Sequence, residues 1–140
     1  MAETAKTRPG TMHLIDALQY RLPLAGLVSI LHRASGGVLF ILLPFVIWMF
    51  DTSVTSEVSF DSFTSAFVVG IGFVPGWLVK VVALFLIWAY LHHFIAGLRH
   101  LWMDATHSVS AQFGRRSAMF TLGLSLLLTV LLGAKLFGAY

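Results

Sequence analysis

The stretch Tyr90–Asp104, YLHHFIAGLRHLWMD, decides how this chain folds and where its chemistry lies. On a helix, one face of this stretch carries three ionisable residues and a glycine: His93, Gly97, His100 and Asp104. Their spacing follows the 3.6-residue period of an α-helix. Ionisable groups inside an apolar span are costly, so they mark a site by default. A neutral imidazole at membrane depth is a common axial ligand of haem iron, and Gly97 has no side chain to keep a flat ring away.

The composition places the chain in a membrane. Its 140 residues are 58% hydrophobic and only 11% charged, whereas a soluble domain carries about 25% charged residues. There are no cysteines, so this chain cannot by itself hold a disulfide, an iron–sulfur cluster or a cysteine zinc site. A net charge of +3 is weak evidence for nucleic acid, and we expect a lipid bilayer and no nucleic acid as partner. The predicted fold class is all-α and integral to the membrane.

Three apolar runs predict three transmembrane helices, over about 23–50, 77–102 and 117–137. Each is long enough, because about 20 helical residues cross the hydrocarbon core. Pro23 suits the first turn of the first helix, and we expect Pro44 to kink that helix.

The remaining segments are polar or short. We expect loops over 51–65 and 104–116, and an interfacial or re-entrant segment over 66–74. Residues 11–20 fit a short helix lying at the membrane interface. The predicted domains are an N-terminal tail and interfacial segment, 1–22, and a three-helix transmembrane domain, 23–140.

Basic residues gather on one side of the predicted bundle. They precede or begin the first helix and surround the second loop: Lys6, Arg8, Arg21, Arg33, Arg99, Arg115 and Arg116. The positive-inside rule then places the N-terminus in the bacterial cytoplasm or, alternatively, in the mitochondrial matrix. The first ten residues resemble neither a secretory signal nor a transit peptide, which favours the bacterial inner membrane.

The first helix carries a second polar cluster. One side of this helix is shared by Ser29, His32, Arg33, Gly36 and Phe40. An arginine at the bilayer centre costs about 2.5–3.5 kcal/mol. A lone Arg33 can reach back to the headgroups and only set the topology, but its neighbours Ser29 and His32 favour a binding role. A guanidinium suits a propionate carboxylate or a polarised quinone carbonyl.

Spacing limits which histidines can share one iron. His93 and His100 are separated by about 10.5 Å of helical rise, and His92 points about 100° away from His93. A single intramembrane histidine is often only a packing residue, but the polar face opposite Arg33 favours a ligand role for His93. His32 and His93 lie at similar depth, about 14 Å from the inner ends of their helices. Spacing therefore permits either a bis-histidine haem within this chain or a second ligand from another subunit.

Two segments resemble motifs of a known family. Ser29–Gly36 (SILHRASG) and His93–Asp104 (HFIAGLRHLWMD) are similar to the SxxHRxSG and HxxxGxRHxxxD motifs of the cytochrome b556 subunits of succinate dehydrogenase. The resemblance covers about 21–140 and implies a haem b- and ubiquinone-binding membrane anchor of respiratory complex II. Such a chain does not oxidise succinate itself but contributes to the quinone-reduction site. The implied partners are a companion membrane anchor subunit, an iron–sulfur subunit and a flavoprotein subunit.

The resemblance also implies roles for single residues. The histidine at the His93 position is an axial ligand of haem iron, and the companion membrane subunit supplies the second. The His32 position lies near the haem propionates, and the Ser29 and Arg33 positions bind ubiquinone.

Some assignments stay open at this point. His100 and Asp104, near the inner surface, are candidates for relaying protons to the quinone. Nothing in the sequence fixes the direction of the reaction, so a quinol-oxidising fumarate reductase anchor is a rival. A haem-free membrane scaffold whose histidines only pack is another. A small proton carrier is disfavoured, because no second helix bears a buried acid.

Overall fold

The computed structural model describes Ile15 and residues 20–139. The interfacial helix expected over 11–20 lies outside the described residues, apart from Ile15 and Tyr20. The described elements follow in the order α2 (Leu24–Val54), α3 (Glu57–Val68), β1 (Gly70–Ile71), β2 (Val74–Pro75), α4 (Gly76–Thr106) and α5 (Ala111–Leu136). The helices α2, α4 and α5 are each long and apolar enough to cross a membrane. The predicted all-α fold with three transmembrane helices is therefore confirmed.

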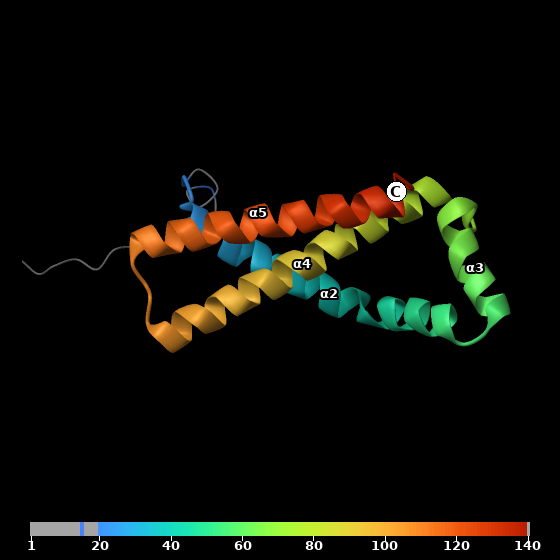
Figure 1. Ribbon diagram of the computed structural model, residues 1–140, viewed down its shortest axis with the longest axis horizontal. Helices are drawn as coiled ribbons and strands as arrows, with labels where there is room; N and C mark the ends of the chain where they lie inside the picture. Colours follow the sequence, from blue (N-terminus) through green and yellow to red (C-terminus); the bar gives the residue numbers. More distant parts are fainter. Residues whose placement is uncertain (1–14, 16–19, 140) are drawn as a thin grey trace, which may run out of the picture.

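The central helix of the bundle is α4, which packs against both α2 and α5. Figure 1 shows α2 crossing α4, and α3 joining the far ends of these two helices. The buried residues where the three long helices meet are small: Val28 of α2, Ala96 of α4 and Ala118 of α5. Lipid is as apolar as a leucine side chain, so helices in a bilayer associate through close packing of small residues. That packing sets the positions of the polar side chains described below.

Helix α5 meets its neighbours through a stripe of small and hydroxyl-bearing residues. Its buried positions are Gly114, Ala118, Thr121, Ser125, Thr129 and Gly133. The hydroxyls of Thr121 and Thr129 donate to carbonyl oxygens one turn earlier, at 3.0 and 2.7 Å, so they are satisfied within α5. Many of the large apolar side chains of α5 are exposed, which suits a helix that meets lipid on its other faces.

The loop predicted over 104–116 is shorter than expected, so its predicted bounds are wrong. Helix α4 continues to Thr106 and α5 begins at Ala111, so only residues 107–110 connect them. His107 has a left-handed backbone, with φ of 52°, and ends α4. Ser110 then caps α5, because its hydroxyl oxygen accepts a hydrogen bond from the Phe113 N–H at 3.2 Å.

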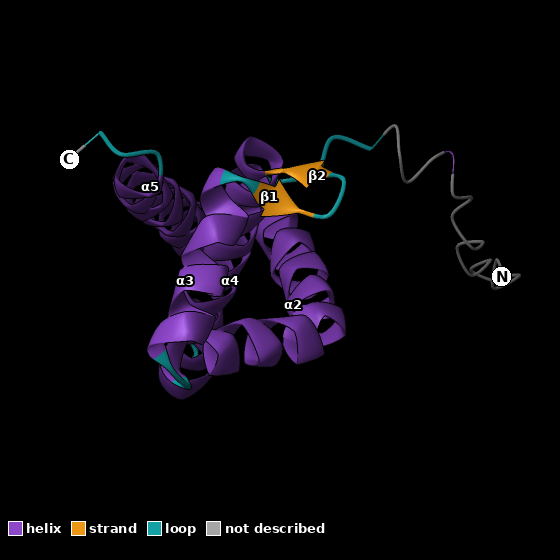
Figure 2. Ribbon diagram, turned by 90° about the vertical axis from the view of Figure 1, so that its right-hand side faces the viewer, coloured by secondary structure: helices purple, strands orange, loops and turns teal. Residues whose placement is uncertain are grey.

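The loop predicted over 51–65 is also wrong. Helix α2 continues through Pro44 without a break as far as Val54, and its axis bends in its second half (Figures 1 and 2). Helix α3 then starts with a capping box. The Ser56 hydroxyl accepts from the Ser59 N–H at 3.1 Å, and the Ser59 hydroxyl accepts from the Ser56 N–H at 3.0 Å. The serines that suggested a loop instead supply the helix cap.

The segment 66–74, expected to be interfacial or re-entrant, holds the end of α3 and most of a small hairpin (Figure 2). Strand β1 pairs antiparallel with β2. Gly70, which begins β1, and Gly72, in the turn between the strands, both have positive φ. The hairpin leads directly into α4 at Gly76.

The cap of α3 can be tested with Ser56→Ala. Loss of an N-cap hydroxyl costs about 1 kcal/mol, so we expect the α3 amides to exchange hydrogen several-fold faster in the purified protein. Ser62→Ala is the matched control, because the Ser62 hydroxyl only bonds back to the Val58 carbonyl within α3. Equal exchange in the two variants would contradict the capping role.

Candidate functional site

The site is built where α2 and α4 cross, around a pair of histidines. The rings of His32 and His93 stack face to face, with centroids 4.2 Å apart and planes 9° from parallel. Nδ1 of His93 lies 2.9 Å from the backbone carbonyl oxygen of His32. A carbonyl oxygen only accepts hydrogen bonds, so Nδ1 is a protonated nitrogen, and in the neutral imidazole Nε2 then carries the lone pair. The arrangement therefore leaves His93 with a free nitrogen that can bind a metal.

Ser35 supports this contact, and sequence reasoning missed it. Its side chain is buried, and its hydroxyl donates to the same His32 carbonyl at 3.0 Å. The hydroxyl oxygen also lies 3.4 Å from Nδ1 of His93. The signal for this role was available, because Ser35 lies three residues after His32 and so reaches back to its carbonyl on a helix.

Gly36 is the glycine that the histidine pair requires. A methyl group at this position would lie 2.6 Å from Cε1 of His93, which is closer than packed atoms approach. Gly97 is less constrained, since a methyl group there would meet only Nε2 of His32 at 3.6 Å. The imidazole of His32 thus lies near Gly97, and the approach of a haem to Gly97 stays a prediction.

His100 extends the cluster toward the end of α4. Its ring centroid lies 5.1 Å from that of His32, and the planes are tilted by 48°. The ring of His32 therefore contacts both His93 and His100, which lie two turns apart on α4. Within the described residues, no group of three His, Cys, Asp or Glu side chains is placed to hold a metal ion. The cluster is thus not a three-histidine metal centre of its own.

The other predicted site residues lie at the edges of this cluster. Asp104 and Arg33 are exposed, and Ser29 is half-buried one turn before Arg33. Among the described residues, neither the Ser29 hydroxyl nor the Arg33 guanidinium has a hydrogen-bond partner. The structure thus brings His32, His93 and His100 together with Gly97, and it leaves Ser29 and Arg33 available to a ligand.

His92 faces a different helix from His93. It is completely buried, with its ring stacked on Trp88 at 5.5 Å between centroids and Nδ1 lying 3.5 Å from the Ser125 hydroxyl of α5. Its Nε2 is buried and has no hydrogen-bond partner among the described residues. The two adjacent histidines therefore have different roles. His92 lies in the α4–α5 interface, and His93 lies in the site between α2 and α4.

A family comparison matches the chain over residues 5–132, a range that includes both histidine motifs, to the succinate dehydrogenase/fumarate reductase transmembrane subunit family. The chain belongs to this family. The resemblance identified from the two motifs is therefore confirmed, and the chain is an integral membrane subunit.

Similar proteins from several organisms agree with this membership. The chain is 32% identical over 128 residues to the succinate dehydrogenase cytochrome b556 subunit of Paracoccus denitrificans, covering 91% of this chain and 93% of that protein. It is 31% identical over 119 residues to the protein of the same name from Coxiella burnetii, covering 85% and 90%. It is 30% identical over 124 residues to the succinate dehydrogenase cytochrome b560 subunit of Reclinomonas americana, covering 89% and 83%.

The close fit of Gly36 against His93 gives a stability test with a neighbouring control. Gly36→Ala forces the His93 ring away from the His32 carbonyl, and overpacking of this kind costs about 1–3 kcal/mol. A methyl group at Gly37 would meet nothing within 4 Å, so Gly37→Ala should gain the usual helix preference for alanine. In thermal unfolding of the purified protein, the melting temperature of Gly37→Ala should therefore be higher than that of Gly36→Ala. A reversed order would contradict the packing of His93 against Gly36.

Proposed function

We propose that this chain is the haem b- and ubiquinone-binding membrane anchor of a succinate dehydrogenase, which passes electrons from an iron–sulfur subunit to ubiquinone. The names of its relatives in Paracoccus denitrificans and Coxiella burnetii support the cytochrome assignment. The main structural observation in favour of the proposal is the contact between Nδ1 of the His93 imidazole and a backbone carbonyl oxygen.

The residues around His93 fit a haem. Histidines that ligate metals usually donate their other ring N–H to a carbonyl or carboxylate, which fixes the tautomer and the ring orientation. His93 makes this contact with the His32 carbonyl, and Ser35 supports it. A haem bound through Nε2 of His93 would supply a one-electron redox centre at membrane depth.

The second axial ligand belongs, in this proposal, to the companion membrane subunit. The rings of His32 and His93 stack with centroids 4.2 Å apart, so in this arrangement they could not hold one iron between them. His32 is then a neighbour of the haem rather than a ligand, and its position beside Arg33 suits contact with the propionates. Spacing alone allowed either a haem with two histidine ligands from this chain or a second ligand from another subunit, and the stacking of His32 on His93 favours the latter.

Ubiquinone is proposed to bind at Ser29 and Arg33. The Ser29 hydroxyl can donate to a quinone carbonyl oxygen, and the Arg33 guanidinium can stabilise the negative charge that develops during reduction. Both side chains lie on the same helix as His32, so the quinone would bind beside the haem. Protons for the quinone are assigned to His100 and Asp104, which lie one turn apart where α4 approaches its C-terminal end.

The distribution of charge supports the proposed orientation and partners. Arg21 and Arg33 lie near the start of α2, and Arg115 and Arg116 near the start of α5. By the positive-inside rule we assign this side to the cytoplasm of a bacterium, with the mitochondrial matrix as the alternative. The iron–sulfur and flavoprotein subunits would dock on this side, close to Ser29 and Arg33.

Two alternatives are kept for specific reasons. The family includes both succinate dehydrogenase and fumarate reductase subunits, so a quinol-oxidising anchor uses the same residues in reverse. The names of the relatives favour succinate oxidation. A haem-free scaffold would need His93 only for its contact with α2, and the first experiment below separates this possibility from the cytochrome.

Replacing His93 tests the haem assignment. His93→Leu should abolish the low-spin b-type spectrum of the purified complex, because the iron loses its ligand from this chain. His92→Leu is the matched control and should keep the spectrum, since His92 faces α5. An unchanged spectrum in His93→Leu, at equal complex content, would contradict the assignment.

The quinone site is tested by comparing two activities of the same membranes. Ser29→Ala should weaken quinone binding by about 0.5–1.5 kcal/mol, the contribution of one hydrogen bond. Arg33→Leu should cost more, because charge stabilisation is lost along with binding. Both variants should lower succinate–ubiquinone activity relative to succinate–dye activity, whereas Ser53→Ala, near the other end of α2, should not. An unchanged ratio in both variants would place the quinone elsewhere.

A further inference from the structure

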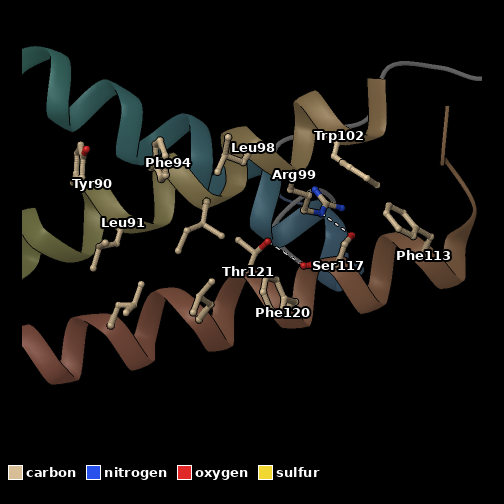
Figure 3. Close-up of a pocket in the computed structure, with 13 residues that line it drawn as sticks. Tyr90, Leu91, Phe94, Leu98, Arg99, Trp102, Phe113, Ser117, Phe120 and Thr121 are labelled. Atoms are coloured by element: carbon tan, nitrogen blue, oxygen red, sulfur yellow. Dashed lines mark hydrogen bonds between the residues drawn. The ribbon is translucent and has the colours of Figure 1, made fainter. Parts of the chain in front are cut away.

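A long groove between α4 and α5 has no role in the proposed quinone chemistry. Its volume is about 600 Å³, and its walls are almost entirely apolar. Figure 3 shows Tyr90 and Leu91 toward one end and Trp102 and Phe113 toward the other. The polar side chains of Arg99, Ser117 and Thr121 line the half of the groove near Trp102.

The guanidinium in this groove has only neutral partners. Arg99 is 9% exposed; its Nε donates to the Ser117 hydroxyl at 2.8 Å, and one terminal nitrogen donates to the Gly114 carbonyl at 3.4 Å. Its other terminal nitrogen has no partner in the part of the chain that the structure describes, and no acidic residue lines the groove. Arginine stays charged in proteins, and a charge at membrane depth is costly unless it is paired. An anion bound in the groove beside Arg99 would therefore balance the charge of the guanidinium.

The depth of Arg99 indicates which anion this is. Helix α4 has 31 residues, about 46 Å of rise, whereas the hydrocarbon core is about 30 Å thick. A centred α4 would therefore extend about 8 Å beyond the core at each end. Arg99 lies about 10 Å from the Thr106 end, which places it at the border between acyl chains and headgroups. Trp102 suits the same level, and exposed Arg115 and Arg116 add positive charge at the start of α5.

The length of the groove matches one leaflet. Along α4 the lining runs from Tyr90 to Trp102, about 18 Å of helical rise, and half of the hydrocarbon core is about 15 Å. An acyl chain entering beside Arg99 would thus lie along the groove to the middle of the bilayer. We propose that the groove binds one anionic phospholipid of the leaflet where α4 ends, with its phosphate on Arg99 and an acyl chain between α4 and α5.

Retention of lipid by the purified complex tests this proposal. The complex is equilibrated with vesicles of phosphatidylglycerol and phosphatidylcholine, and bound lipid is measured by native mass spectrometry. The wild-type complex should retain phosphatidylglycerol in preference to phosphatidylcholine. Arg99→Gln should weaken this retention about tenfold or more, the effect of losing a hydrogen bond to a charged group. Lys135→Gln removes an exposed charge at the other end of α5, away from Arg99, and should change the retention little.

A second pair of variants tests the acyl chain. Leu124 lines the groove, whereas Leu127 on the same helix is 56% exposed outside it. Leu124→Trp should fill the groove and abolish retention, and Leu127→Trp should preserve it. Equal retention in the wild type, Arg99→Gln and Leu124→Trp would overturn the proposal.

A photocrosslink identifies the occupant in an otherwise unchanged chain, so the test stands even where a variant fails to assemble. Benzoylphenylalanine replaces Leu98, which lines the groove. A covalent adduct with the mass of a phospholipid supports the proposal. An adduct with another polypeptide would overturn it, because a neighbouring subunit would then cover the groove and supply the partner of Arg99.

Discussion

The contact between Nδ1 of His93 and the carbonyl oxygen of His32 is the interaction on which the proposed site depends. It connects α2 to α4 at mid-membrane, where an unpaired polar group is costly. It also decides which nitrogen of His93 carries the proton, and so which nitrogen is free for iron. Gly36 makes the contact possible, because any side chain there would occupy the space of the imidazole ring. The local packing of two helices and the chemistry of the site thus have one cause.

The polar residues of α4 divide between its two neighbours. His93 and His100 face α2, whereas His92 and Arg99 face α5. Each buried polar group on the α5 side meets a small or hydroxyl-bearing residue, such as Ser125 or Ser117. This division lets one side of α4 contribute to the proposed haem site while its other side packs against α5.

Much of this arrangement could be predicted from the sequence, and the exceptions have physical reasons. Apolar length gave the three spanning helices, and the 3.6-residue period put His93, Gly97 and His100 on one face. The helix starts at Glu57 and Ala111 were missed, because Ser56 and Ser110 are polar residues that serve as caps rather than as loop. The roles of Ser35 and Gly36 depend on where α2 crosses α4, and a crossing point between helices is not encoded in either helix alone. The hydrogen bond from Arg99 to Ser117 was missed for the same reason, because it depends on where α4 packs against α5.

The absorption spectrum of the wild-type complex containing this chain tests the central claim most directly. The complex would be purified through this chain and reduced with dithionite. A haem held by His93 and a ligand from the companion subunit predicts the α-band of a low-spin b-type cytochrome, in proportion to the amount of this chain. A complex that contains the flavoprotein and iron–sulfur subunits in full amount but shows no such band would contradict the claim. The histidines would then serve only to pack α2 against α4.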